Sequence, residues 1–285
     1  MIDILRHSFV QNAFFAGVIV AVISGFVGYF IVLRGQAFAC EALSHVGFTG
    51  ALGAALVGAG SLEGMFVFTL IAAIGMGALG KRLNNRDIEV GMVLSFLLGI
   101  GVLFLSLYTK NATEAVGVLF GSILSVTTSD VIVTLISGLV MIAVMIVLFR
   151  PLLFASIEPE VAEARGVPVQ QLSILFLILL ALSVAVTVKV VGVLLVFALL
   201  VVPAAAAEHL THRPWLAISI SVLISLLATL GGLILAFVGH WPVSFYIVSL
   251  TSLFYFIALI VHAVRYPRRY RELPHPSREV FPPSD

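Results

Sequence analysis

Charged residues are scarce in this chain, and cysteine is almost absent. Asp, Glu, Lys and Arg together make up only 10% of the 285 residues, whereas a soluble domain carries about 25%. Hydrophobic residues make up 61% of the chain, and its mean hydropathy is +1.20. This composition excludes a soluble globular protein and predicts an all-α polytopic membrane protein.

These scarcities exclude several kinds of site and partner. The single cysteine, Cys40, cannot build a disulfide framework within the chain, and one thiol cannot form a cysteine-rich metal site. The net charge is only +1, with no long basic run, which argues against nucleic acid as a partner. The expected surroundings of the protein are membrane lipid.

Long apolar runs predict eight or nine spans, because about 20 helical residues cross a bilayer. The expected spans are 13–33, 41–59, 65–80, 88–108, 131–149, 172–188, 192–207, 215–238 and 243–264. The number falls to eight if the segment that begins at Glu41 is broken or re-entrant. The stretch 110–129 is less apolar, and we expect an external loop there with a re-entrant or an interfacial helix.

Charge predicts the side of the membrane on which the connections lie. The loop 81–87 is the most cationic internal loop, so the positive-inside rule places it in the cytoplasm. Residues 265–285 hold five arginines and five prolines, which predicts a disordered cytoplasmic tail after a membrane domain of residues 1–264. Three spans before the cationic loop would place the N-terminus outside, whereas Arg6 and His7 favour the inside.

Two polar side chains stand at the start of the second expected span. Glu41 and His45 are four residues apart, so both project from one face of a helix. A carboxylate within a membrane helix costs about 2.5–3.5 kcal/mol on insertion scales, so it indicates a functional site by default. Carboxylate oxygen and imidazole nitrogen together suit Zn²⁺, Mn²⁺ or Fe²⁺. The alternative is a hydrogen bond between Glu41 and His45 at a buried helix end.

The residues around this pair have two interpretations each. Arg34 precedes it by seven residues and pairs either with Glu41 or with phospholipid headgroups, in a structural or a gating role. Cys40 is adjacent to Glu41 and is either a soft metal ligand or a small buried hydrophobic residue. The residue types alone do not separate these interpretations.

Other polar residues along the chain are weaker candidates. Glu114 is either a further carboxylate for the metal or an exposed acid of the 110–129 stretch. Lys189 is either a lysine that extends to the interface from a helix end or a gating charge. Glu208, His209 and His212 form either a metal contact on the cytoplasmic side or a solvated polar turn.

A short soluble helix is predicted at about residues 157–167, and we call it the coupling helix. Pro159 suits the first helical position, and Glu160 complements the positive end of the helix dipole. Arg165 lies in the expected last turn, and Gly166 can adopt the left-handed conformation that ends a helix. So short a helix is marginal in water alone, so it should pack either on this protein's own surface or against a cytoplasmic partner.

Four segments occur in a specific order and spacing. They are VLR at 32–34 with EALSH at 41–45, VLFGSIL at 118–124, FRPLLF at 149–154 with PE at 159–160 and ARGVP at 164–168, and VGVLLV at 191–196 with ALL at 198–200 and PAA at 203–205. Together they resemble the permease subunits of the ABC-3 family, which take up Zn, Mn or Fe with a separate binding protein. The resemblance extends over about residues 15–264.

The resemblance implies a permease of a divalent-metal importer, with no catalytic activity and no cofactor of its own. It implies a homodimer in the bacterial plasma membrane, a separate ABC ATPase, and an extracellular or periplasmic metal-binding protein. The chain contains no Walker A sequence, which agrees with a separate ATPase. The residues expected to contact that ATPase lie on the coupling helix and are Glu160, Glu163, Ala164, Arg165 and Gly166.

Departures from the family pattern leave the identity of the ion open. The family commonly has Asp where this chain has Glu41, and Asn where it has Ser122. The Glu side chain is one methylene longer, which alters the metal geometry and leaves Zn²⁺, Mn²⁺ and Fe²⁺ as candidates.

Two other functions compete with a metal permease. A secondary ion-coupled transporter would show an internal repeat with paired acids, and no convincing repeat is present. An intramembrane metalloprotease would need His-Glu-x-x-His, and the chain offers only Glu41 followed four residues later by His45.

Overall fold

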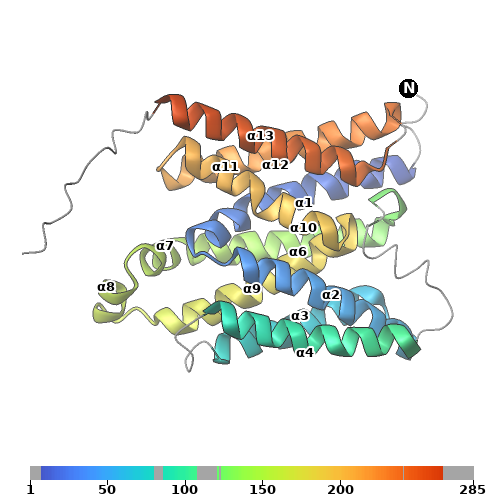
Figure 1. Cartoon of the computed structure of the whole chain (residues 1–285), viewed down its shortest axis with the longest axis horizontal. Helices are drawn as coiled ribbons and strands as arrows, with labels where there is room; N and C mark the ends of the chain where they lie inside the picture. Colours follow the sequence, from blue (N-terminus) through green and yellow to red (C-terminus); the bar gives the residue numbers. More distant parts are fainter. Residues whose placement is uncertain (1–7, 80–85, 108–120, 122, 240, 266–285) are drawn as a thin grey trace, which may run out of the picture.

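The computed structural model describes residues 8–79, 86–107, 121, 123–239 and 241–265, and this part of the chain is helical (Figure 1). Its elements are α1 (Ser8–Leu33), α2 (Ala37–Val57), α3 (Ser61–Leu79), α4 (Arg86–Leu107), the 3₁₀ turn η2 (Ile123–Ser125), α6 (Thr128–Val147), α7 (Phe149–Ile157), α8 (Pro159–Ala164), α9 (Val169–Val191), α10 (Val193–Leu200), α11 (Val202–Leu210), α12 (Pro214–Val238) and α13 (Val243–Arg265).

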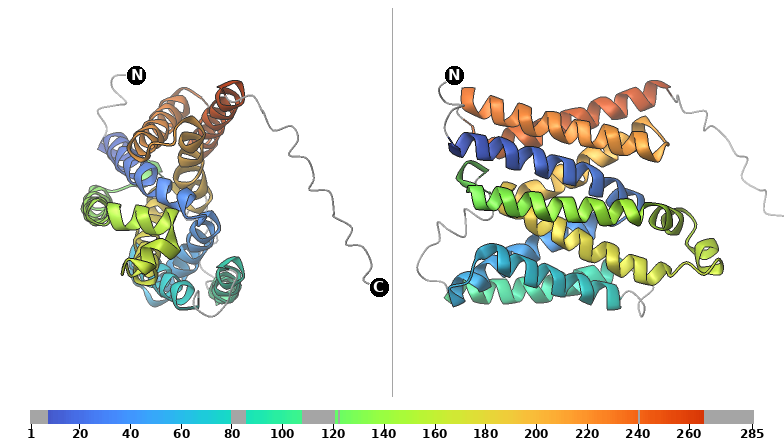
Figure 2. Two further views of the ribbon diagram at one scale, coloured as in Figure 1. Left: turned by 90° about the vertical axis from the view of Figure 1, so that its left-hand side faces the viewer. Right: turned by 180° about the vertical axis from the view of Figure 1, so that it is seen from behind.

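Nine segments of the described residues are long and apolar enough to cross a membrane, with α10 and α11 together forming one of them. This confirms the larger of the two predicted span numbers. The segment that carries Glu41 is neither broken nor re-entrant, because α2 runs continuously for 21 residues. The long helices lie side by side, with α3 and α4 along one edge and α12 and α13 along the other (Figures 1 and 2).

Polar contacts identify the two ends of this bundle. At the end that carries α8, which we call the α8 end, Arg34 after α1 donates hydrogen bonds to Ser156 of α7 and Ser173 of α9. At the opposite end, which we call the distal end, Asn12 of α1 donates to the Thr128 hydroxyl of α6. The first helix therefore begins at the distal end, and α7 and α8 project beyond the long helices at the other (Figure 2).

Burial separates central helices from peripheral ones. In α1 and α9, 72% of the most apolar window is buried, against 17% in α4 and α13. A helix that is apolar all round is expected either in a core or in lipid. Large apolar side chains such as Phe96 of α4 and Phe256 of α13 are exposed, so these helices form the outer surface of the bundle and α1 and α9 its core.

Several boundaries differ from those predicted, because hydrophobic periodicity does not report where local backbone geometry changes. The fifth span was expected to end at Phe149, but α6 ends at Val147 and a second helix, α7, follows at once. Pro151 lies in the first turn of α7, where a missing backbone N–H costs nothing. The span expected at 192–207 is interrupted at Val201, and α11 continues through Leu210 into the expected polar turn.

Candidate functional site

The two polar side chains of α2 are in contact. Nε2 of His45 lies 3.3 Å from Oε1 of Glu41, as expected for residues one helical turn apart. The Glu41 and His45 side chains are 37% and 32% exposed, respectively. Glu41 Oε2 is buried and has no hydrogen-bond partner. The pair thus presents an unsatisfied carboxylate oxygen next to an imidazole, which is a usable part of a metal-binding set.

This pair alone does not complete a coordination shell. The described part of the chain contains no group of three or more His, Cys, Asp or Glu side chains arranged to hold a metal ion. A transition-metal ion takes four or more ligands. An ion at Glu41 and His45 therefore needs further donors from water, from backbone carbonyls or from another chain.

The rest of α2 holds these two side chains in place through buried contacts. Ser44 donates to the Glu41 carbonyl oxygen at 2.7 Å, and Thr49 donates to the Leu97 carbonyl of α4 at 3.3 Å. Cys40 is fully buried in the main hydrophobic core. The face of α2 that carries the pair is partly open, whereas the face that carries Cys40 is packed.

Arg34 joins three elements at the α8 end. Its Nη1 lies 3.0 Å from the Ser156 hydroxyl and its Nη2 lies 2.6 Å from the Ser173 hydroxyl. The guanidinium also lies over the Phe176 ring, 5.3 Å from its centroid. Hydroxyl acceptors and an aromatic ring hold this cation and connect α1 to α7 and α9.

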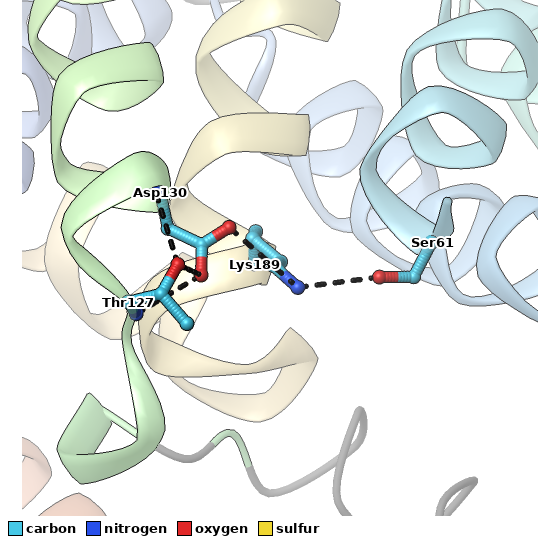
Figure 3. A network of polar contacts seen from close by, with 4 residues as sticks. All are labelled: Ser61, Thr127, Asp130 and Lys189. Carbon is cyan, nitrogen blue, oxygen red and sulfur yellow. Dashed lines mark hydrogen bonds and ion pairs between the residues drawn. The ribbon is translucent and has the colours of Figure 1, made fainter.

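Lys189 joins three helices at the distal end (Figure 3). Its Nζ donates to the Ser61 hydroxyl of α3 at 3.3 Å and lies 3.9 Å from Asp130 Oδ1 of α6. Asp130 also accepts a hydrogen bond from the Thr127 backbone, while the Thr127 hydroxyl accepts from the Asp130 backbone N–H, which forms a capping box. The sequence did not indicate either partner of Lys189.

The helix expected at 157–167 is present in shortened form as α8. Gly166 has φ +81°, and its N–H donates to the Glu163 carbonyl while Val167 N–H donates to the Ala162 carbonyl. These two bonds are the Schellman arrangement that ends a helix. Ala162 is buried. The five residues expected to meet the ATPase are all exposed: Glu160, Glu163, Ala164, Arg165 and Gly166.

The remaining candidates that the structure describes belong to other elements than α2. Glu114 lies outside the described residues. Glu208 and His209 belong to α11, whereas His212 is exposed in the turn that follows. The His209 ring packs against those of Tyr255 and His262 on α13. His209 therefore contributes to the packing of α11 against α13.

Sequence reasoning missed two buried polar residues at the α8 end, Gln36 and Glu89. Both line a cavity of about 280 Å³ between the ends of α2, α3, α4 and α9. The sequence offered one signal for Glu89, which is an acidic residue within the apolar run that follows the cationic loop. Gln36 lines the same cavity as Glu89 only because of how the helices pack, so no spacing within the sequence could reveal it.

The fold and these sites define a class before any relative is considered. Nine apolar spans among the described residues, a metal-type donor pair on one of them and a short helix projecting from one end indicate a polytopic membrane transport permease. Comparison with known proteins gives the family. The family model for the ABC 3 transport family matches residues 6–262, and the chain belongs to that family.

Relatives and solved structures agree with this assignment. The manganese transport system membrane protein MntC of Halalkalibacterium halodurans is 30% identical over 81% of this chain and 80% of its own length. The manganese import system permease protein ScaB of Streptococcus parasanguinis is 30% identical, with 90% and 91% covered. The structure of PsaBC from Streptococcus pneumoniae in complex with Fab aligns with a TM-score of 0.81 and 29% identity, covering 90% of this chain and 94% of that one.

A second solved structure shows the fold at a greater distance. An inward-facing conformation of a metal-chelate type ABC transporter has a TM-score of 0.68 and 15% identity, with 88% of this chain covered. The family model and the relatives at 30% identity show that the present chain is a multi-pass membrane permease of a bacterial ABC transport system. It is the transport component of that complex and not an enzyme.

Proposed function

We propose that this permease carries a divalent transition-metal ion into the cell, and that Mn²⁺ is its main substrate. The observation that carries the proposal is the contact between Glu41 and His45, 3.3 Å apart on an apolar helix. Mn²⁺, Zn²⁺ and Fe²⁺ all accept such an oxygen and nitrogen pair. The relatives at 30% identity that are named for manganese favour Mn²⁺ among the three.

The exposure of this pair supports a water-filled path or a protein contact along α2. About one third of each side chain is open in the single chain, and a carboxylate facing lipid is costly. The permease is proposed to act as a homodimer, as the family resemblance implies, and Glu114 is proposed as a further carboxylate for the ion. Arg34 is proposed to have a structural role, because it connects α1 to α7 and α9.

The proposed complex has one partner at each end of the bundle. We assign the α8 end to the cytoplasm, with a separate ABC ATPase bound to the exposed residues of α8. A solute-binding protein would deliver the ion at the distal end. ATP binding and hydrolysis would then shift the helices between outward-open and inward-open states.

The test is ATP-driven uptake of radioactive Mn²⁺ by proteoliposomes that contain the permease, its ATPase and its binding protein, with Zn²⁺ and Fe²⁺ compared in parallel. We expect Glu41→Gln and His45→Ala each to lower Mn²⁺ uptake at least about tenfold, because changes in residues that merely orient ligands already cost 10–100-fold. The ATPase should still co-purify with both variants.

The matched control is Glu63→Gln, which changes an exposed carboxylate in the first turn of α3. This variant should transport Mn²⁺ as the unchanged protein does. Normal Mn²⁺ uptake by the Glu41→Gln/His45→Ala double variant would contradict the proposed site. Preference for Zn²⁺ or Fe²⁺, lost in the same variants, would keep the site and change the ion.

A further inference from the structure

A polar cavity lies at the α8 end, where the ends of α2, α3, α4 and α9 come together and Glu163 of α8 reaches the lining. Its volume is about 280 Å³, which is room for several water molecules, each of which occupies about 30 Å³ in the liquid. We call it the vestibule. Its polar lining residues are Gln36, Asp87, Glu89, Glu163, Gln170 and Ser173.

Two of these residues are buried and have unsatisfied oxygens. Glu89 is only 2% exposed and Gln36 is 8% exposed. Neither Oε1 of Glu89 nor Oε1 of Gln36 has a hydrogen-bond partner. Buried polar atoms are almost always paired, so an unpaired carboxylate oxygen and an unpaired amide oxygen on one cavity are available to a bound water or ion.

Both oxygens belong to residues at the N-terminal ends of helices, and this position explains why each can stay without a protein partner. Glu89 and Asp87 lie in the first turn of α4, where the helix dipole favours negative charge. Gln36 occupies the N-cap position of α2, but its side chain makes no capping hydrogen bond. Its amide oxygen is therefore free to accept from, or to coordinate, a molecule in the vestibule.

The charge of the lining selects the kind of ligand. Asp87, Glu89 and Glu163 are acidic, and the one cation bonded to the lining among the described side chains is Arg34, through Ser173. Carboxylate, amide and water oxygens are the donors that Mn²⁺, Mg²⁺ and Ca²⁺ prefer. An anion would meet two unpaired acceptor oxygens, so the vestibule fits a cation.

We propose that the vestibule is a second divalent-cation site, in which Glu89 and Gln36 bind the ion and water completes its coordination shell. Among the described residues no three His, Cys, Asp or Glu side chains lie close enough to hold a metal together, so the proposed site needs water for its remaining ligands. Asp87 and Glu163 are exposed at the rim and attract the cation to the site.

The position of the vestibule assigns it a role in release. Ala39, two residues before Glu41 on α2, belongs to its lining, and Glu163 brings α8 to its rim. In this role, which rests on the proposed metal transport, the ion leaves Glu41 and His45 for an oxygen-lined site that holds it more weakly. Movement of α8 with the ATPase would then displace Glu163 and open the rim.

The experiment measures Mn²⁺ binding to the full-length permease in lipid nanodiscs, from the electron paramagnetic resonance signal of free Mn²⁺. The starting protein is the Glu41→Ala/His45→Ala variant, which lacks the α2 pair. We expect this variant to retain Mn²⁺ binding, and we expect a further Glu89→Gln change to weaken that binding at least tenfold. Gln36→Leu should weaken it as well.

Glu63→Gln in the same background is the matched control and should leave Mn²⁺ binding unchanged. Glu89→Gln keeps the size of the side chain, and elution as the same species on size exclusion confirms folding. Mn²⁺ binding that is absent from the starting variant, or unchanged by Glu89→Gln, overturns the site.

Uptake separates this inference from the proposed function. If the complex transports Mn²⁺, Glu89→Gln should lower the maximal uptake rate at least threefold and leave the KM for external Mn²⁺ unchanged. If the complex transports no Mn²⁺ while the Glu89-dependent binding persists, the proposed function fails and the cation site stands. A raised KM with an unchanged maximal rate would overturn the release role.

Discussion

Asp130 serves two interactions at once at the start of α6. Its Oδ2 accepts from the Thr127 backbone at 3.1 Å, and its Oδ1 lies 3.9 Å from Lys189 Nζ. An N-cap contributes about 1 kcal/mol to stability. The Lys189 and Asp130 side chains are 30% and 21% exposed, and an ion pair in contact with solvent contributes about 0–1 kcal/mol. The cap should therefore matter at least as much to stability as the ion pair, although Lys189 connects more helices.

This comparison gives a prediction for stability at the distal end. Thr127→Ala should lower the free energy of unfolding by about 1 kcal/mol, because it removes the hydroxyl that accepts from the Asp130 N–H. Lys189→Met should lower it by less, because it keeps the packing of the alkyl chain. Thermal unfolding of both variants in the same lipid nanodiscs checks the order, and a larger loss for Lys189→Met would contradict it.

Residue contacts within one helix could be predicted from the sequence, and contacts between helices could not. The approach of Glu41 to His45 follows from the spacing of four residues, since both lie on α2. The partners of Lys189, and the presence of Gln36 and Glu89 on one cavity, depend on which helices become neighbours. Hydrophobic patterns specify that a helix is buried but not what it is buried against.

At the scale of elements, the backbones of α2 and α3 pack closely at two glycines, Gly50 and Gly64. A Cβ on Gly50 would collide with the Gly64 carbonyl oxygen, and a Cβ on Gly64 would collide with the Gly50 carbonyl oxygen. Small residues at membrane-helix contacts allow this backbone approach. The position of α2, and with it the Glu41–His45 pair, depends on both glycines.

A methyl group at Gly50 should therefore separate α2 from α3. We expect Gly50→Ala to cost about 1–3 kcal/mol, as overpacking does, and to lower the unfolding temperature in nanodiscs by several degrees. Gly91→Ala is the control, because a Cβ there meets no atom within 4 Å, and a helical Gly→Ala change is otherwise stabilising. An equal effect of the two variants would exclude close α2–α3 packing as the cause.

The existence of the helices followed from the sequence better than their ends did. The apolar runs predicted eight or nine spans, and the described residues hold nine, because the bilayer imposes length and composition. The break at Val201 and the start of α7 at Phe149 were missed, because they reflect local backbone geometry inside continuous apolar sequence. The left-handed conformation of Gly166 was predicted correctly, but α8 ends at Ala164, before the expected end at about residue 167.

For the molecule as a whole, α8 is the element that extends farthest beyond the bundle at its end (Figure 2). Ala162 anchors it through a fully buried side chain, and the Arg165 guanidinium lies 5.8 Å from the centroid of the Phe154 ring on α7. Its other residues are exposed. This arrangement is suited to transmit a force from a docked ATPase to α7 and α9.

Disruption of this surface should separate ATPase binding from ion binding. We expect Ala164→Arg to lower co-purification of the ATPase at least about tenfold, because a long charged side chain would stand where a methyl group is expected to contact the partner. Mn²⁺ binding by the isolated permease should be unchanged. Arg213→Glu, in the exposed turn before α12, is the control, and equal loss of the ATPase in both variants would contradict docking on α8.

Burial of Cys40 next to Glu41 gives the protein a built-in chemical probe. The chain has one thiol, it is fully buried, and it belongs to the same helical turn as the proposed ligand. A small water-soluble alkylating reagent can modify that thiol only while α2 is separated from its neighbours. The rate of alkylation, compared with and without ATP turnover, therefore reports how long this part of the helix stays hydrated in each transport cycle, and no engineered label is required.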